Sequence, residues 1–433
     1  MDLDALRSSL QETPALRPVG HVRAVTGLSV RAMLAGARIG DVVLLKRRGE
    51  PLPAEVVGFD QGEAVLIPLG ELSGVGPDDA VESTGAPLSI GAGAALLGRV
   101  LDGLGRVVDG GPEPRGLTSV PVDRAPPPAL GRRPVAEPLS TGVRAIDGLL
   151  TVGVGQRVGL FAGSGVGKST LLGAIARGTS ADVVVVALVG ERGREVGDFL
   201  EHALGEEGRK RSVVVVATSD SPSLERLRAA QTATAVAEHF RDRGKSVMLL
   251  VDSITRFARA QREVGLAAGE PPARRGYPPS VFAMLPRLLE RSGQGERGSI
   301  TAIYTVLVEG GDMDEPIADE VRGILDGHIV LDRRIAARGH YPAIDVPVSL
   351  SRVMDAVVSP EHRTAAREVR ALIGAYEDKR DLIALGAYAA GSDAAVDRAI
   401  AALPAVNRFL QQDARQIEPF EGTVQALAKL AKA

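Results

Sequence analysis

The segment GSGVGKST at residues 163–170 combines glycines with a lysine and two hydroxyl residues, and it is the strongest chemical signal in the sequence. It lies between an apolar run, VGLFA, and a helix-like segment, STLLGAIA. Backbone N–H groups of such a loop can surround phosphates, and the positive end of the following helix attracts them. In this pattern Lys168 reaches the terminal phosphates and the Ser169 hydroxyl binds magnesium. The pattern predicts a nucleotide-binding loop formed by Gly163, Ser164, Gly165, Val166, Gly167, Lys168, Ser169 and Thr170.

Two carboxylates could complete a site for nucleotide hydrolysis. Asp252 directly follows the apolar run SVMLLV, and a carboxylate at the end of a strand beside the phosphate loop can hold Mg²⁺. An isolated Asp after a strand is more often a helix cap, but pairing with the phosphate loop favours the metal role. Glu191 follows another apolar run, in the turn GERGREV, from which it could orient the attacking water. By spacing alone, an ion pair with Arg192 or Arg194 is an equal alternative.

These residues need a sheet to bring them together, and the sequence predicts one. Continuous apolar runs, rather than alternating ones, are typical of strands that are buried on both faces in a parallel sheet covered by helices. Each run is followed by a polar loop and a helix-like segment, so the central region is predicted to be α/β. The runs are residues 158–162, 183–189, 213–217, 247–251 and 300–308.

The segments on either side of this central region have different residue patterns. Between residues 20 and 89, short Val- and Leu-containing runs alternate with turn signals, which predicts a small antiparallel barrel or sandwich. Residues 121–138 contain six prolines and are expected to form an extended connector. From Ser359, a cap residue, a proline and helical spacing of apolar residues predict helices to the end. The expected domains are residues 1–18, 19–90, 91–355 and 356–433.

At the N-terminus, Leu3, Leu6 and Leu10 have helical spacing in a polar segment. This arm is predicted to be a helix that either covers the chain's own surface or docks another protein.

Composition excludes several classes of function. The chain has no cysteine, so it has no disulfide framework, thiol nucleophile or Cys-ligated zinc, and its six histidines form no ligand-like cluster. A net charge of −3, 3% aromatic residues and no tryptophan argue against a nucleic-acid partner. Neither a signal peptide nor an apolar run of about 18 residues is recognisable, and a cytoplasmic protein is expected.

Longer strings carry a family resemblance over nearly the whole chain. The set GSGVGKST, GERGREV, VDSITRFARAQREVGLAAGEPPARRGYPPSVF, LVEGGDMDEPIADEVRGILDGHIVL and RGHYPAID with SLSRVM resembles the ATPases of bacterial type III secretion systems. Flagellar export ATPases and catalytic subunits of rotary ATP synthases are relatives. The resemblance implies a RecA-like P-loop ATPase domain with a parallel sheet, preceded by a small β-barrel and followed by a helical domain.

The resemblance also assigns residues. It implies that Glu191 activates water, that Asp252 is the Walker B acid, and that the Tyr341 ring packs on adenine. It makes Arg352 an arginine finger that reaches into the neighbouring subunit's site, and Arg192 a second arginine of the catalytic turn. ATP and Mg²⁺ are therefore the expected substrate and metal. Because Glu191, Tyr341 and Arg352 occur on one chain, a complete homohexamer is expected.

Some strings are more similar to injectisome ATPases than to flagellar ones, namely DGLLTVGVGQR, AEVVGFDQGEAVLIPLGELSGV and VVATSDSPSLERL. The catalytic strings are shared by both. The resemblance implies work at the cytoplasmic face of the inner membrane, peripheral to an export gate. It also implies unfolding of substrates, release of chaperones, and contact with a stator-like regulator and a central stalk protein.

Three alternatives stay open at the level of sequence. A catalytic subunit of a rotary ATP synthase would use the same chemistry in another machine. A Rho-like helicase would need a basic, aromatic barrel surface, whereas this barrel segment mixes acids with bases and has almost no aromatic residues. A nucleotide-binding scaffold that does not turn over would retain the phosphate loop but not the hydrolytic role of Glu191.

Overall fold

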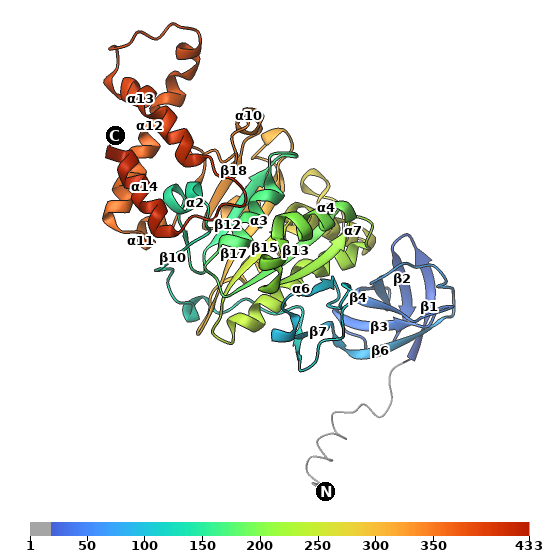
Figure 1. Cartoon of the computed structure of the whole chain (residues 1–433). Helices are drawn as coiled ribbons and strands as arrows, with labels where there is room; N and C mark the ends of the chain where they lie inside the picture. Colours follow the sequence, from blue (N-terminus) through green and yellow to red (C-terminus); the bar gives the residue numbers. More distant parts are fainter. Residues whose placement is uncertain (1–18, 433) are drawn as a thin grey trace.

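The computed structural model describes residues 19–432, so the helix predicted for residues 1–18 lies outside the described residues. Figure 1 shows three parts in chain order, with an all-β part at one end, an α/β part in the centre and a helical part at the opposite end. This order is the predicted one. None of the described helices combines the length and the apolar character that crossing a membrane requires.

The N-terminal part is a closed barrel, which decides between the predicted barrel and sandwich. Its strands pair in the order β1-β2-β5-β4-β3-β6, all antiparallel. Alternate residues of these strands, among them Val30, Val43 and Leu66, point into a small apolar centre. The strands are β1 (Val19–Thr26), β2 (Ser29–Met33), β3 (Asp41–Leu45), β4 (Leu52–Asp60), β5 (Glu63–Pro68) and β6 (Ala80–Pro87).

The central part is built on one large sheet with the strand order β19-β18-β12-β17-β15-β13-β14-β8. Its neighbouring strands are parallel except for β19 at one edge and β16, which pairs with β17 from outside this order. The five strands predicted from apolar runs are all present. The strands are β8 (Val100–Asp102), β12 (Arg157–Ala162), β13 (Val183–Glu191), β14 (Ser212–Thr218), β15 (Ser246–Asp252), β16 (Gly293–Gln294), β17 (Ser299–Leu307), β18 (Gly327–Leu331) and β19 (Leu350–Ser351).

Both faces of this sheet are buried, which explains the continuous apolar runs. Along β13, Val183 and Val185 pack in one apolar core, whereas Val184 and Val186 pack in the core on the opposite face. Helices cover both faces. They are α2 (Arg144–Leu149), α3 (Lys168–Gly178), α4 (Gly193–Asp198), α5 (Gly205–Lys210), α6 (Ser223–Arg241), α7 (Ile254–Ala267), α8 (Pro279–Leu289), α9 (Pro316–Ile324), α10 (Arg333–Ala337) and α11 (Met354–Val357).

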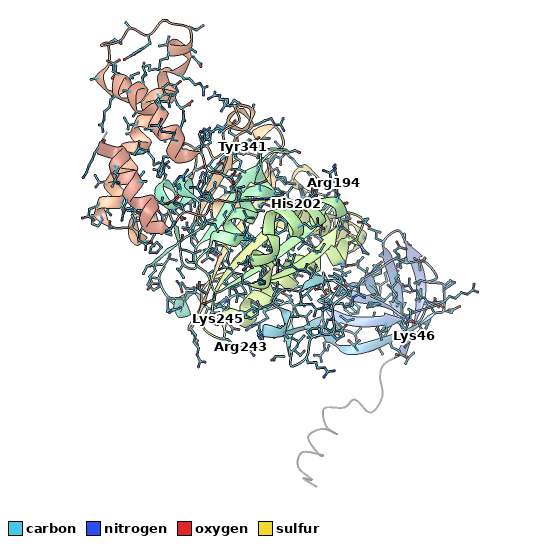
Figure 2. The ribbon with its side chains drawn as sticks, in the orientation of Figure 1. Lys46, Arg194, His202, Arg243, Lys245 and Tyr341 are labelled. Atoms are coloured by element: carbon cyan, nitrogen blue, oxygen red, sulfur yellow. The ribbon has the colours of Figure 1, made fainter. Side chains whose placement is uncertain are left out.

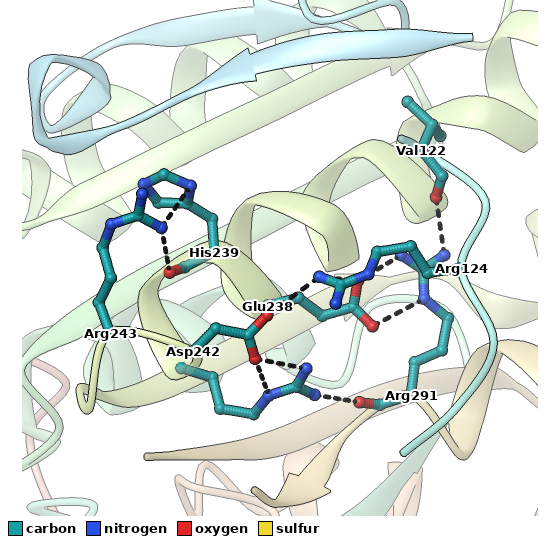
Figure 3. A network of polar contacts seen from close by, with 8 residues as sticks. Val122, Arg124, Glu238, His239, Asp242, Arg243 and Arg291 are labelled. Atoms are coloured by element: carbon teal, nitrogen blue, oxygen red, sulfur yellow. Dashed lines mark hydrogen bonds and ion pairs between the residues drawn. The ribbon is translucent and has the colours of Figure 1, made fainter. Parts of the chain in front are cut away.

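The proline-rich connector is held by a hydrogen bond from a buried arginine and by an ion pair of its own (Figure 3). Arg291 Nη1 donates to the Val122 carbonyl at 2.9 Å, and its Nη2 lies 2.7 Å from Glu238 Oε2. Arg124 on the connector reaches Asp242 at 3.0 Å. A charge removed from water in this way is tolerated only when it is paired and hydrogen-bonded. Short strands flank the connector: β7 (Ser89–Ala92) pairs with β9 (Thr118–Pro121), and β10 (Pro138–Leu139) pairs with β11 (Val152–Gly153).

The C-terminal part consists of α12 (Pro360–Ala384), α13 (Ala394–Leu410) and α14 (Phe420–Lys432). The predicted start of α12 is confirmed, because the Ser359 side chain accepts a hydrogen bond from the His362 N–H at 3.2 Å. The predicted apolar face is confirmed as well, since Ala365, Val369 and Leu372 are buried. This face packs against the same core as α3, so the helical part is anchored beside the phosphate loop.

Candidate functional site

The segment GSGVGKST forms a loop between β12 and α3, as predicted. Gly165 and Gly167 have φ angles of 78° and 86°, in the left-handed region that glycine adopts without strain. Val166 between them is buried and anchors the loop, whereas Ser169 and Thr170 in the first turn of α3 are exposed. The loop therefore presents backbone N–H groups and two hydroxyls at a helix N-terminus, an arrangement suited to binding phosphate.

Parallel strands bring the predicted catalytic residues together. Glu191 is the last residue of β13 and Asp252 the last of β15, and these strands are neighbours whose carboxyl ends lie at the same edge. The Lys168 ammonium lies 3.3 Å from Glu191 Oε1 and contacts Asp252 Oδ1 directly. Thr305, near the end of β17, donates to Asp252 Oδ1 at 2.8 Å. Both carboxylates thus lie within hydrogen-bonding distance of the Lys168 ammonium.

Arg256, in the first turn of α7, was not selected from the sequence. Its Nη1 lies 2.6 Å from Glu191 Oε2 and donates to the Gly190 carbonyl at 2.5 Å. The same guanidinium therefore fixes both the Glu191 side chain and the end of the strand that carries it. The available signal was its place four residues after Asp252, on the helix that follows this strand. Thr305 gave no comparable signal.

The alternative in which Glu191 pairs with Arg192 or Arg194 is not what the structure has. Arg192 is exposed and lies 3.9 Å from Glu195, and Arg194 is exposed and lies 3.4 Å from Asp198. Figure 2 shows Arg194 at the surface of the central part. The turn GERGREV therefore directs the Glu191 side chain inward, toward Lys168, and directs these two arginines outward.

Glu191 and Glu195 share a hydrogen bond, and their pKa values move in opposite directions. Burial, followed by this hydrogen bond, raises the pKa of Glu191, while Lys168 and Arg256 act against the rise. The same hydrogen bond lowers the pKa of Glu195. A carboxyl with a raised pKa beside the lysine of the predicted phosphate loop is suited to proton transfer with a water molecule.

A magnesium ion would find few protein ligands here. In residues 19–432, no cluster of three or more acidic or histidine side chains could hold a metal by itself. The candidates are the Asp252 carboxylate and the Ser169 hydroxyl. This pair fits a Mg²⁺ ion that takes its remaining ligands from water and from nucleotide phosphates, as is usual for this metal.

A cavity of about 440 Å³ lies beside the loop and faces the C-terminal helices. Tyr341 lies at its mouth with 46% of its surface exposed, and its ring approaches Gly167 so closely that a Cβ there would lie 3.4 Å away. Figure 2 shows Tyr341 on the side of the central part that faces these helices. Apolar surface dominates, as a purine base requires. The lining residues are Val143, Gly165, Gly167, Thr170, Leu171, Ala174, Tyr341, Pro342, Gln412, Asp413, Ala414 and Gln416.

Arg352 is not brought to this site. It directly follows β19, where Ser351 pairs with Gly327 at the start of β18, whereas the phosphate loop follows the other end of the sheet. The strand β12 separates the two ends by about 17 Å at 3.3 Å per residue. The exposed Arg352 guanidinium makes no hydrogen bond or ion pair with any residue between 19 and 432. Within one chain, Arg352 therefore cannot reach the phosphate site that is predicted at Lys168.

Two protein-family models match the chain. The nucleotide-binding domain of the ATP synthase alpha/beta family matches residues 142–351, and the C-terminal domain of the type III secretion ATPase EscN matches residues 358–429. Together they span the site and the helical part that closes its cavity.

Relatives and solved structures agree with these matches. The chain is 51% identical to the flagellum-specific ATP synthase of Bacillus subtilis over 99% of both chains. It is 52% identical to the type 3 secretion system ATPase of Xanthomonas euvesicatoria over 96% of this chain and 94% of that one. The structure of the assembled ATPase EscN from the type III secretion system of enteropathogenic E. coli has a TM-score of 0.90 and 48% identity, covering 95% of this chain and 100% of that chain. The chain therefore belongs to the family of ATP-hydrolysing enzymes formed by type III secretion ATPases and flagellum-specific ATP synthases.

Proposed function

We propose that this chain is the subunit of a homohexameric motor that hydrolyses ATP with Mg²⁺ at the interfaces between copies and energises type III protein export. One observation carries the proposal: Lys168, Glu191 and Asp252 converge at one edge of the sheet, while Arg352 stands exposed at the other. A head-to-tail contact between copies closes into a ring and would bring these two edges together. The relative EscN, whose structure is that of an assembled ATPase, supports this arrangement.

In the proposed reaction, the loop from Gly163 to Thr170 holds the phosphates, with Lys168 on the terminal groups. Ser169 and Asp252 hold the magnesium ion, and Tyr341 packs on the base. Glu191 orients the attacking water and accepts a proton from it. Arg352 of the adjacent copy meets the negative charge that develops on the transferring phosphoryl group, a role worth about 10³-fold or more in rate. Arg192, which is exposed in the single chain, is proposed as a further contact across the interface.

Partners and location belong to the same proposal. EscN has been determined in complex with its central stalk EscO, and this relative is 48% identical to the chain, so a central stalk protein is a proposed partner. The other proposed partners are a stator-like regulator, chaperone–substrate complexes and an export gate at the inner membrane. No nucleic-acid partner is proposed. Flagellar and secretion relatives match at 51% and 52% identity, so both systems are candidates. The injectisome-like strings favour the secretion system. The proposed domain limits are 1–18, 19–90, 91–355 and 356–433.

Mixed rings test the central claim. A Lys168→Ala chain lacks the phosphate lysine but keeps the finger, and an Arg352→Ala chain has the opposite defect. Each alone is expected to lose ATP hydrolysis, whereas an equimolar mixture should recover about a quarter of the wild-type rate, because a quarter of the head-to-tail interfaces combine an intact loop with an intact finger. A mixture as inactive as its components, although it assembles, would exclude a finger supplied by the neighbouring copy.

A further inference from the structure

The loop that carries Arg352 is fastened to Asp326, the residue before β18. The Arg352 N–H donates to the Asp326 carbonyl at 3.0 Å. Asp326 is in turn clamped on Arg157, the first residue of β12. Its Oδ2 accepts from the Arg157 N–H at 3.1 Å and from Nε at 3.0 Å, while its Oδ1 accepts from Nη2 at 3.2 Å. A two-point pair between guanidinium and carboxylate fixes orientation as well as distance.

Gln156, the residue before Arg157, completes this fastening. Its side chain is fully buried, and its Nε2 donates to the Asp326 carbonyl at 2.9 Å and to Ser351 Oγ at 3.2 Å. Ser351 immediately precedes Arg352 and donates its own hydroxyl to the Thr151 carbonyl at 2.8 Å. The Gln156 amide therefore binds both Ser351 and the Asp326 carbonyl, which is the same carbonyl that accepts from the Arg352 N–H.

A second carboxylate, that of Glu290, also pairs with the Arg157 guanidinium. Glu290 contacts Arg157 on its other side and lies 3.1 Å from Arg132 of the connector. Only 14% of the Arg157 side chain is exposed. Burial alone would lower the pKa of Arg157, but its hydrogen bonds and charge contacts with Asp326 and Glu290 outweigh burial and raise it. The guanidinium is thus a permanent cation that these carboxylates hold in place.

Gln156 and Arg157 lie at the start of the same strand that leads to the predicted phosphate loop. Gln156 and Arg157 lie at the start of β12, and the phosphate loop begins at Gly163, directly after the same strand ends. Strand β12 is hydrogen-bonded on both sides, to β17 and to β18. A strand held in this way moves as a unit, so a displacement of the phosphate loop is transmitted to the far end of the strand.

We propose that Gln156, Arg157 and Asp326 are positioning residues that hold Arg352 in the geometry required at the neighbouring site, and that they couple it through β12 to the phosphate loop of their own chain. This proposal rests on the proposed function, because it needs Arg352 to act on the next copy. If it holds, nucleotide bound at the phosphate loop of one copy changes the position of the Arg352 side chain that the same copy presents to the next copy.

Asp326→Asn tests the proposal, because it keeps the backbone carbonyl and the size of the side chain but removes the ionic clamp. The assembled variant is expected to lose about 10- to 100-fold in kcat, the range for a misplaced catalytic group. ATP affinity at its own phosphate loop should stay within about twofold of wild type. Mixed with Lys168→Ala, the variant should regain activity, because its loop then meets an intact finger on the other chain.

The matched control is Asp109→Asn. Asp109 forms the same kind of two-point pair with Arg99, at 2.7 Å and 2.9 Å, and also accepts from the N–H of Val100, the first residue of β8. This pair lies at the opposite end of the strand order from β18 and β19. The control should lose stability comparably but keep kcat within about twofold, since it contacts no residue of the site.

Several outcomes would overturn the proposal. Wild-type kcat in Asp326→Asn would do so, as would a loss of activity that Lys168→Ala cannot restore, because such a loss would lie in the variant's own phosphate loop. Should Asp326→Asn fail to fold, Ser351→Ala takes its place with a smaller loss in the same direction, and an unchanged kcat there overturns the proposal equally. If the mixture of Lys168→Ala and Arg352→Ala chains assembles but does not hydrolyse ATP, the proposed function itself is wrong. The two failures can therefore be distinguished.

Discussion

Arg256 Nη1 lies 2.6 Å from Glu191 Oε2, and the arginine comes from the helix that follows the strand bearing Asp252. The proposed water-activating carboxylate is therefore held by a cation that enters the site beside the proposed metal ligand. Because Arg256 also donates to the Gly190 carbonyl, it positions both the Glu191 side chain and the backbone of the turn that carries it. Two oxygens of Glu191 are thereby assigned, one to Arg256 and one to Lys168.

Removing this arginine should affect turnover more than binding. Arg256→Met is expected to lower kcat about 100-fold, since Glu191 loses its fixed orientation, with ATP affinity changed by less than about threefold. Arg256→Lys should recover part of the loss, because an ammonium supplies charge without the planar two-point geometry. Steady-state kinetics with equilibrium nucleotide binding measure both quantities. A variant whose affinity falls as much as its kcat would place Arg256 in nucleotide binding instead.

Replacing the carboxylate itself separates binding from hydrolysis. Glu191→Gln should retain ATP binding, because Lys168 and the loop are untouched, and should lose hydrolysis by about three orders of magnitude or more. Glu191→Asp serves as the control that keeps the charge but shortens its reach. Phosphate release and nucleotide binding are measured on the same preparation. Unchanged turnover in the Gln variant would remove Glu191 from the mechanism.

The shared hydrogen bond with Glu195 should appear in the pH dependence. Because burial and Glu195 raise the pKa of Glu191, the acid limb of kcat is expected above the usual range for a glutamate. Glu195→Gln can donate an N–H to the ionised Glu191, so the pKa of Glu191 should fall and the acid limb should move to lower pH. Lys168 and Arg256 still face Glu191 in the variant and favour the same direction. An acid limb that stays in place, or moves upward, would contradict this assignment.

The cavity beside Tyr341, where we propose that the base binds, gives a prediction for KM. Tyr341→Ala should raise KM for ATP about tenfold with kcat nearly unchanged, as expected for the loss of an aromatic packing surface that binds ground state and transition state alike. Tyr341→Phe keeps the ring and should resemble the wild type. If the Phe variant shows the full defect, the hydroxyl rather than the ring is what the nucleotide requires.

A buried carboxyl in α2, that of Asp147, predicts a pH-dependent stability. Asp147 accepts hydrogen bonds from Ser140, Thr141 and Gly142, yet burial raises its pKa to about 6. The folded state therefore binds a proton more tightly than the unfolded chain. The stability from this group is complete below about pH 4, the unfolded value, and is lost as the pH rises through about 6.

Asp147→Asn cannot titrate, and its amide N–H group would face hydrogen-bond donors. The variant should be less stable than the wild type by about 2 kcal/mol near pH 5. The difference should shrink between pH 5 and pH 7, as only the wild type loses stability there. Urea unfolding followed by circular dichroism at both pH values measures the change. A difference that is constant, or that grows with pH, would show that Asp147 does not titrate in this range.

The helices and strands and the chemistry within each segment could be predicted from the amino-acid sequence. Runs such as Val183–Val189 are apolar throughout because both faces of the strand are buried, and this property needs no knowledge of the partner strands. Other local signals likewise act only on neighbouring residues: the glycines of the phosphate loop, the cap at Ser359 and the prolines of the connector. Each could therefore be recognised from its own segment of the sequence.

Contacts between residues that are far apart in the chain depend on the folded arrangement and could not be predicted in this way. Arg256 and Thr305 reach the site because parallel strands end at one edge, and no spacing in the sequence states the strand order. The same order places Arg352 at the far end of β12, away from its own phosphate loop and fastened to Asp326. Periodicity reports whether a residue is buried, whereas contacts between segments depend on how the strands are arranged, a property of the whole chain.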